Sequence, residues 1–232
     1  MATYVLIHGA GSDSWYWHLV APLLRARGHE VVAPDLPCGD ESAGLAEYTE
    51  VVVDAIGDRS GDLVVVAQSM AGFTGPLVCD KVPVDLLVLL AAMVPAPGES
   101  PGDWWAHTGH ARARRELDEQ EGRDPDAAFD PVVTFLHDLP PQLVAELMSG
   151  PARAQAEAPF LKPWPLPSWP DVPTRFLLCR QDRWFPAEFQ RRVVRERLGF
   201  TPDEMDGGHL VALSRPEELV ERLEAYRTGL QS

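Results

Sequence analysis

A serine, an aspartate and a histidine in this sequence have the residue types and settings that nucleophilic catalysis requires. The serine is Ser69, which follows the apolar run 63–66 and has Ala67 and Ala71 two residues away on either side. The run predicts a buried strand, and the residues after Ser69 predict a helix. A serine on a sharp turn between strand and helix forms a nucleophile elbow, where small neighbours allow a close approach. Ser69 is therefore the candidate nucleophile.

The elbow departs from its usual pattern, G-x-S-x-G, because alanine replaces both glycines. Alanine is still small, so the steric requirement of the turn is kept. A different interpretation also fits the local sequence: a serine at this position can simply cap the following helix. The motif alone does not decide between these two interpretations.

The acid and the base are expected at the ends of two later strands. Asp182 comes soon after the predicted strand 174–178, and His209 ends a glycine-containing turn after the weak strand 200–205. The carboxyl ends of parallel strands are where α/β folds place their sites. Asp182 can also be an ordinary loop or helix-capping acid. Asp206 is a competing carboxylate, although its position predicts a turn former.

These residues predict acyl-transfer chemistry. Ser69 would attack a carbonyl carbon, His209 would accept its proton, and Asp182 would orient the imidazole and offset its positive charge. The backbone N–H groups of Ala10 and Met70 are candidate oxyanion donors, each typically worth ~3 kcal/mol of transition-state stabilisation. Ala10 lies in a glycine-rich loop after the predicted strand 4–7, and that loop can also be no more than a tight turn.

The elements that must position these residues alternate between strands and helices, which predicts a mostly parallel sheet flanked by helices. We expect an α/β-hydrolase fold with six strands and a helical cap. The core is expected over residues 1–92 and 171–232, and the cap over 93–170, where the alternation stops and proline, glycine and tryptophan are frequent. One amphipathic helix is expected over residues 15–27. The candidate lining residues of a substrate pocket are Ser12, Trp104, Trp105, Phe135, Trp164 and Leu210.

Composition limits the partners of the protein. The formal net charge is −15, which makes nucleic acids and anionic membranes poor partners. The three cysteines have neither disulfide nor metal-ligand spacing, so we expect no metal and no cofactor. The first residues show no signal peptide and no stretch spans a bilayer. We expect a cytoplasmic protein acting on a small-molecule ester, with a homodimer left open.

The sequence resembles the plant methylesterases and hydroxynitrile lyases of the α/β-hydrolase superfamily, together with their bacterial esterase relatives. The resemblance covers both ends of the chain well and residues 93–170 poorly. It implies Ser69, Asp182 and His209 as the triad and Ala10 and Met70 as the oxyanion donors. The matching segments are Tyr4 to Ala10, Trp15 to Trp17, Ala21 to Leu24 with Gly28-His29, Pro34 to Leu36, Ser69, Asp182 with Pro186 to Gln190, and Gly208-His209 with Ser214 to Pro216.

The resemblance also bears on the reaction. The lyases that resemble this chain carry a lysine directly after the catalytic histidine, where this chain has Leu210. The expected function is therefore a serine carboxylesterase for small, largely apolar esters, working through an acyl-enzyme on Ser69. The alternatives are a non-hydrolytic enzyme on the same scaffold (lyase, acyltransferase or cofactor-free perhydrolase) and a catalytically silent ligand-binding relative. Gln68, where related esterases often have histidine, raises a question of rate or substrate.

Overall fold

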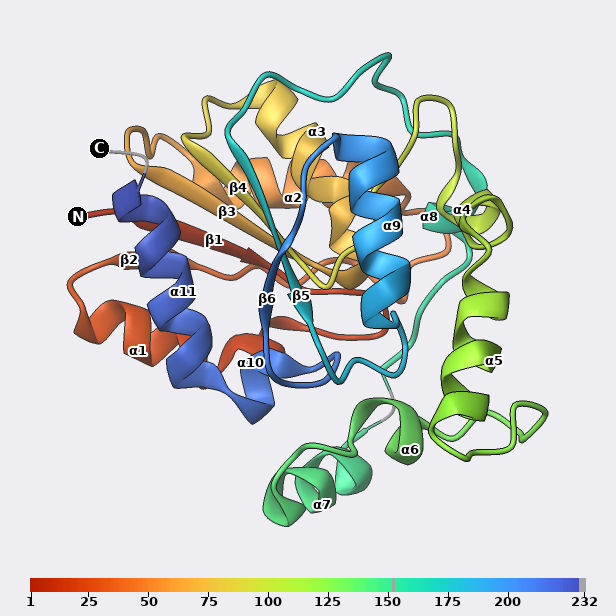
Figure 1. The fold of residues 1–232 in the computed structure, drawn as a ribbon. Helices are drawn as coiled ribbons and strands as arrows, with labels where there is room; N and C mark the ends of the chain where they lie inside the picture. The colour runs from red at the N-terminus through yellow and green to blue at the C-terminus, as the bar shows by residue number, and fades with distance from the viewer. Residues whose placement is uncertain (152, 230–232) are drawn as a thin grey trace.

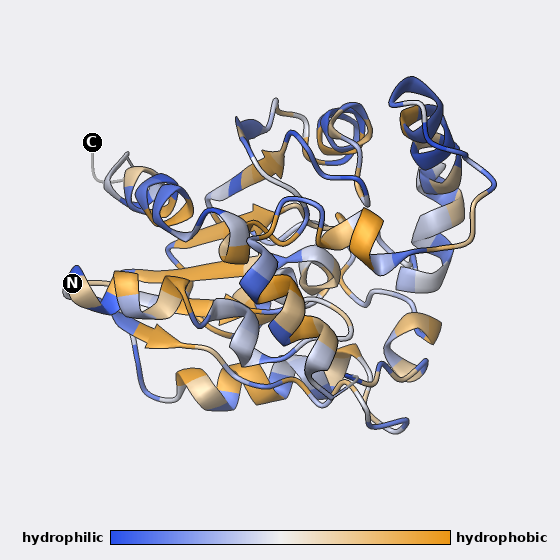
Figure 2. Cartoon of the chain, turned by 90° about the horizontal axis from the view of Figure 1, so that it is seen from below, coloured by the Kyte–Doolittle hydropathy of each residue, from blue (hydrophilic) through white to orange (hydrophobic). Residues whose placement is uncertain are grey.

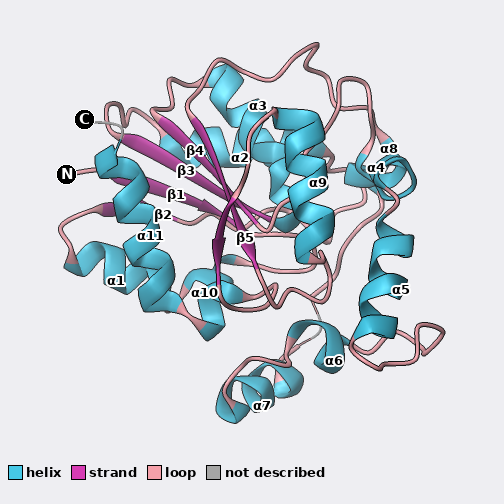
Figure 3. Cartoon of the chain, viewed as in Figure 1, coloured by secondary structure: helices cyan, strands magenta, loops and turns pink. Residues whose placement is uncertain are grey.

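A computed structural model describes residues 1–151 and 153–229. Its centre is a six-stranded sheet in the order β2-β1-β3-β4-β5-β6, and all neighbouring strands are parallel. Figures 1 and 3 show helices on both faces of this twisted sheet. The strands are β1 (Thr3–Ile7), β2 (Glu30–Val32), β3 (Leu63–Gln68), β4 (Leu86–Leu90), β5 (Thr174–Cys179) and β6 (Asp203–Met205).

The central strands are buried on both faces, which explains their continuous apolar sequences. In β3, Val64 and Val66 belong to one apolar cluster, whereas Val65 and Ala67 belong to the other. Successive side chains of a strand point to opposite faces, so each face has its own core. Figure 2 shows the resulting concentration of apolar residues in the strands.

Helices cover both faces of the sheet. The helices α1 (Val20–Ala26), α10 (Val211–Ser214) and α11 (Pro216–Gly229) contribute Leu24, Leu213 and Leu219 to one cluster. The other cluster includes residues of α2 (Leu45–Ile56), α3 (Thr74–Lys81) and α9 (Ala187–Leu198). This three-layer arrangement confirms the predicted α/β fold.

The longest connection in the sheet joins β4 to β5 and carries several short helices. Figure 1 shows α5, α6 and α7 beside and below the sheet, away from its two helical layers. We refer to residues 91–173 as the β4–β5 segment. Its helices are α4 (Pro101–Thr108), α5 (His110–Gln120), α6 (Pro131–Phe135), α7 (Pro141–Ser149) and α8 (Ala158–Leu161). The predicted division into a core and a cap over residues 93–170 stays a prediction.

The single helix expected over residues 15–27 is wrong in its first part. The chain instead forms a 3₁₀ helix, η1 (Ser14–Trp17), and then the separate helix α1. Pro22 lies in the first turn of α1, where its missing N–H leaves no hydrogen bond unmade. A helix starting earlier would require that N–H, so α1 begins at Val20.

In the described part of the chain, no helix is both long and apolar enough to cross a bilayer.

Candidate active site

Ser69 lies on a sharp, strained turn between β3 and the 3₁₀ helix η2 (Ser69–Gly72). Its φ of 55° is in the left-handed region that non-glycine residues rarely adopt. The backbone is held there because Met93 N–H donates to the Ser69 carbonyl at 2.9 Å. A Cβ on Gly72 would lie 1.8 Å from the Met93 carbonyl oxygen. Gly72, three residues after the serine, thus allows the chain after β4 to approach the turn closely, while Ala67 and Ala71 occupy the positions of the usual glycines.

His209 and Asp182 complete a hydrogen-bonded chain with the serine. His209 Nε2 lies 3.0 Å from Ser69 Oγ, and His209 Nδ1 lies 2.8 Å from Asp182 Oδ2. The carboxylate accepts the Nδ1 proton, which leaves Nε2 free to accept the serine proton. Asp182 Oδ1 is itself held by the N–H groups of Trp184 and Phe185, each at 2.8 Å. Ser69, Asp182 and His209 are all largely buried.

Two charged residues that are close to the triad candidates in sequence have partners of their own. Asp206 lies at the surface, where its carboxylate accepts from Arg180 and Gln181, whereas the His209 ring pairs with Asp182. Arg183, the neighbour of Asp182, has partners in the β4–β5 segment. Its guanidinium donates to the Val133 carbonyl at 3.0 Å and pairs with Glu121, so it links the strand end to the β4–β5 segment.

The glycine-rich loop after β1 packs directly against the elbow. A Cβ on Gly9 would lie 2.8 Å from Ser69 Cβ, so only glycine fits at that position. His8 is fully buried, and its Nε2 accepts the Leu36 N–H at 3.1 Å. Burial lowers the pKa of His8, which favours the neutral ring that this hydrogen bond requires. His8 is therefore structural, as its place in the loop indicates.

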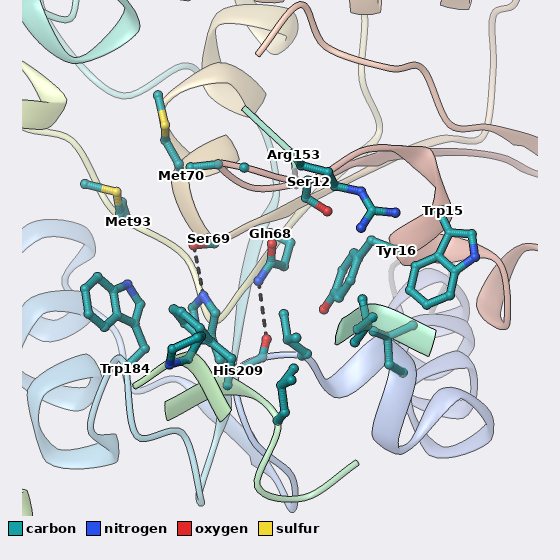
Figure 4. A pocket seen from close by; sticks show the side chains of 18 of the residues that line it. Ser12, Trp15, Tyr16, Gln68, Ser69, Met70, Met93, Arg153, Trp184 and His209 are labelled. Atoms are coloured by element: carbon teal, nitrogen blue, oxygen red, sulfur yellow. Dashed lines mark hydrogen bonds between the residues drawn. The ribbon is translucent and has the colours of Figure 1, made fainter. Parts of the chain in front are cut away.

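A cavity of about 370 Å³ opens at Ser69 and His209, as Figure 4 shows. Ala10 and Met70, the candidate oxyanion donors, line it together with four predicted pocket residues: Ser12, Trp105, Phe135 and Leu210. The oxyanion role of Ala10 and Met70 stays a prediction. Sequence analysis missed further lining residues, among them Trp15, Tyr16, Met93, Arg153, Phe160 and Trp184.

Two predicted pocket residues, Trp104 and Trp164, do not line this cavity. Both are almost completely buried in the main apolar cluster. The Trp104 indole donates to the Val94 carbonyl at 3.0 Å, and the Trp164 indole donates to the Phe73 carbonyl at 3.1 Å. The helices α4 and α8 and the chain after α8 thus press these rings against the sheet layer, where their N–H groups find backbone acceptors.

One further contact joins the β4–β5 segment to the histidine loop. Asp138 Oδ2 accepts the N–H of Gly208, the residue before His209, at 2.6 Å. A Cβ on Gly208 would lie 2.7 Å from Asp138 Oδ1 and 3.0 Å from His137 Nε2. A side chain at position 208 would therefore have to displace the ends of the Asp138 and His137 side chains. Within the described part of the chain, no group of three or more His, Cys, Asp or Glu residues is placed to hold a metal ion.

Comparison with known proteins identifies the family. Residues 4–222 match the model of the alpha/beta hydrolase family. The chain belongs to the alpha/beta hydrolase family. The match covers most of the chain, and it agrees with the parallel sheet and with the elbow after β3.

The relatives of this alpha/beta hydrolase agree with the resemblance predicted from its sequence. It is 25% identical over 253 residues to Methylesterase 7 of Arabidopsis thaliana, covering 93% of this chain and 92% of that protein. It is 24% identical over 243 residues to polyneuridine aldehyde esterase of Rauvolfia serpentina, covering 93% and 92%. The crystal structure of a pyrethroid hydrolase from Sphingobium faniae JZ-2 has a TM-score of 0.77 and 26% identity, covering 98% of this chain and 97% of that one.

Proposed function

We propose that this alpha/beta hydrolase is a serine carboxylesterase that cleaves small, largely apolar carboxylic esters through an acyl-enzyme on Ser69. The observation that carries the proposal is the continuous chain from Ser69 Oγ to His209 at 3.0 Å and from His209 to Asp182 at 2.8 Å. Relatives named methylesterase, aldehyde esterase and pyrethroid hydrolase support ester cleavage as the reaction class.

The geometry supports a two-step reaction. In the first step Ser69 Oγ attacks the ester carbonyl while His209 Nε2 takes the hydroxyl proton, and the protonated His209 then gives that proton to the departing alcohol. In the second step water attacks the acyl-enzyme, and His209 again moves the proton. The N–H groups of Ala10 and Met70 are assigned to the carbonyl oxygen, which is negative in both tetrahedral intermediates.

The cavity supports hydrolysis of esters more than cyanide chemistry. Leu210, which follows the catalytic histidine, lines the cavity with an apolar side chain. A cation at that position, as in the resembling lyases, is therefore missing. The neighbouring lining residues Trp105, Phe135 and Trp184 are aromatic, which suits apolar acyl or alcohol groups.

The proposal is tested by labelling and turnover of Ser69→Ala. We expect a fluorophosphonate probe to add one adduct per chain in the wild type and none in Ser69→Ala. Turnover of 4-nitrophenyl acetate should fall by several orders of magnitude, as losses of triad residues do. Ser42→Ala, at an exposed serine outside the cavity, is the matched control and should behave as the wild type.

The same experiment separates the alternatives. Labelling at Ser69 without release of acid from a panel of acyl esters would favour a transferase, lyase or perhydrolase on this scaffold. Absence of labelling in the folded wild type would favour a silent ligand-binding relative. Near wild-type ester turnover by Ser69→Ala would show that the assignment of the site is wrong.

A further inference from the structure

A single arginine lies in the otherwise mostly apolar wall of the active-site cavity. Among the described residues that line the cavity, Arg153 is the only arginine or lysine. In Figure 4 it lies with Trp15 and Tyr16 on one side of Ser69 and His209, and Trp184 lies on the other side. The proposed esterase mechanism gives no role to this cation.

The guanidinium is held in place from two directions. Arg153 Nε donates to Asp13 Oδ2 at 2.5 Å, and the guanidinium carbon lies 5.5 Å from the centre of the Trp15 ring. Asp13 is itself fixed, because its Oδ1 accepts the Trp15 N–H at 3.1 Å and caps η1. A nearby bond, from Gly11 N–H to Gln155 Oε1 at 2.9 Å, ties the same stretch of chain to the loop after β1. The cation is thus positioned before any ligand binds.

Only one edge of this guanidinium is used. Asp13 takes the Nε proton, and among the described residues neither terminal nitrogen of Arg153 has a hydrogen-bond partner. The two terminal N–H groups of a guanidinium form a fork that matches the two oxygens of a carboxylate. The Arg153 side chain is 27% exposed, so a ligand in the cavity competes with limited water for these donors.

We propose that Arg153 forms a carboxylate subsite, and that the preferred esters are half-esters of dicarboxylic acids or other esters with a second, anionic end. This inference rests on the proposed esterase function, because it places the anionic end at Arg153 while the ester carbonyl lies at Ser69. The apolar residues between these two points would hold the connecting hydrocarbon. The net charge of −15 works against anionic ligands at long range, so a local cation is needed for their capture.

A purely structural role for Arg153 predicts different effects of mutation. Replacing Asp13 distinguishes that role from the binding of a carboxylate. If the ion pair only ties the β4–β5 segment to the loop after β1, then Asp13→Asn and Arg153→Gln should have similar effects. If Arg153 binds a carboxylate, Arg153→Gln should lose the preference for a carboxylate and Asp13→Asn should keep or increase it. Arg153→Gln removes the donor, whereas Asp13→Asn removes a competing negative charge and keeps an oxygen that can cap η1.

Calorimetric titration of the Ser69→Ala protein tests the subsite without any turnover. The probes are 4-phenylbutyrate and its neutral amide, 4-phenylbutyramide, which differ only in the end that would meet Arg153. We expect the acid to bind at least about tenfold more tightly than the amide at low salt, the gain typical of a charged hydrogen-bonded pair. The preference should shrink as ionic strength rises.

In Arg153→Gln the preference for the acid should disappear, and in Asp13→Asn it should be equal or larger. Equal affinities for acid and amide in the parent protein would overturn the subsite, as would parallel loss of acid binding in both variants. Circular dichroism of each variant shows whether it is folded. If Arg153→Gln does not fold, Asp13→Asn still tests the inference, because loss of the acid preference in folded Asp13→Asn would contradict it.

Failure of this inference is distinguishable from failure of the proposed function. The wild type is also assayed with 4-nitrophenyl hydrogen glutarate and with neutral 4-nitrophenyl valerate. Turnover of the valerate without a carboxylate preference in either assay would reject the subsite and keep the esterase. Tight binding of 4-phenylbutyrate without turnover of any ester would keep the subsite and reject the esterase.

Discussion

His209 is the proposed general base, and contacts on several sides hold its ring in place. Asp182 holds its Nδ1 edge and Ser69 lies at its Nε2 edge, at 2.8 and 3.0 Å. The ring also packs edge-on against Phe185, with centroids 5.0 Å apart, and lies 5.4 Å from Phe135. These contacts leave the imidazole few ways to turn, so in the proposed mechanism Nε2 carries the proton between Ser69 and the leaving group.

Replacing Asp182 should therefore remove most of the activity and little of the stability. In Asp182→Asn the amide can donate to Nδ1, which favours the tautomer whose Nε2 carries a proton and cannot act as a base. We expect kcat for 4-nitrophenyl acetate to fall by about three to four orders of magnitude. Asp206→Asn is the control, since this exposed carboxylate contacts Arg180 and Gln181 instead. A large loss in Asp206→Asn with a small loss in Asp182→Asn would transfer the acid role.

At the scale of elements, the sequence predicts the sheet and the triad because both depend on local patterns. An apolar run followed by a short turn places Ser69 and Asp182 at strand ends, and Gly207 and Gly208 place His209 there. The side chains around the triad come from segments whose folding depends on non-local packing. Asp138 lies 70 residues before Gly208, to which it bonds, and no local pattern relates two such positions.

In helix α4, local sequence does not predict which of two adjacent residues faces the cavity. Trp104 and Trp105 are neighbours, so they point about 100° apart around the helix. The structure turns Trp104 into the core and Trp105 toward the cavity. The sequence gives no means of choosing between them, because both are apolar, aromatic and equally suited to either face.

This difference predicts opposite outcomes for two matched substitutions. Trp105→Phe should widen the cavity and raise kcat/KM for longer acyl esters relative to acetate, with a small change in stability. Trp104→Phe should lower the free energy of unfolding by about 1–3 kcal/mol, since it loses buried volume and the bond to the Val94 carbonyl. Relative rates for acyl chains of two to eight carbons and urea denaturation check both. If Trp104→Phe alone alters the acyl-length profile, the placement of the two rings in the cavity wall is wrong.

The β4–β5 segment also supports the histidine loop, through Asp138. Removing its carboxylate in Asp138→Ala leaves the Gly208 N–H without its acceptor and loosens the loop that carries His209. We expect kcat/KM to fall by about tenfold to a hundredfold, because small displacements of a catalytic base are costly. Asp138→Asn keeps an acceptor oxygen and should retain most of the activity.

The measurement that separates positioning from stability is the rate of fluorophosphonate labelling at Ser69, taken where both variants are fully folded. It should be slower in Asp138→Ala than in Asp138→Asn. Equal labelling rates in the two variants would mean that this bond does not position His209.

At the scale of the whole molecule, a cluster of aromatic rings joins the β4–β5 segment to the sheet. His110, at the start of α5, lies at its centre, with ring centroids 4.8 Å from both Trp105 and Trp184 and 5.5 Å from Phe185. Its Nε2 donates to the Trp184 carbonyl at 2.7 Å. The loop after β5, which carries Asp182, is thus anchored to α5 through a neutral, buried imidazole.

This cluster predicts how stability responds to acid. Burial lowers the pKa of His110 from 6.5 to about 4, so between these values the unfolded chain takes up the proton and the folded chain does not. Stability must then fall as pH decreases through this window, by about 2 kcal/mol between pH 7.5 and pH 5 for this one group. His110→Gln keeps a donor for the Trp184 carbonyl but does not titrate, so its unfolding free energy should decrease less over the same interval.

Urea denaturation of the wild type and His110→Gln at the two pH values measures this difference in unfolding free energy. The contributions of His8 and the carboxylates cancel in it because both proteins contain them. Identical losses in the two proteins would mean that His110 can be protonated in the folded state near its ordinary pKa, and that the aromatic cluster does not exclude the charge.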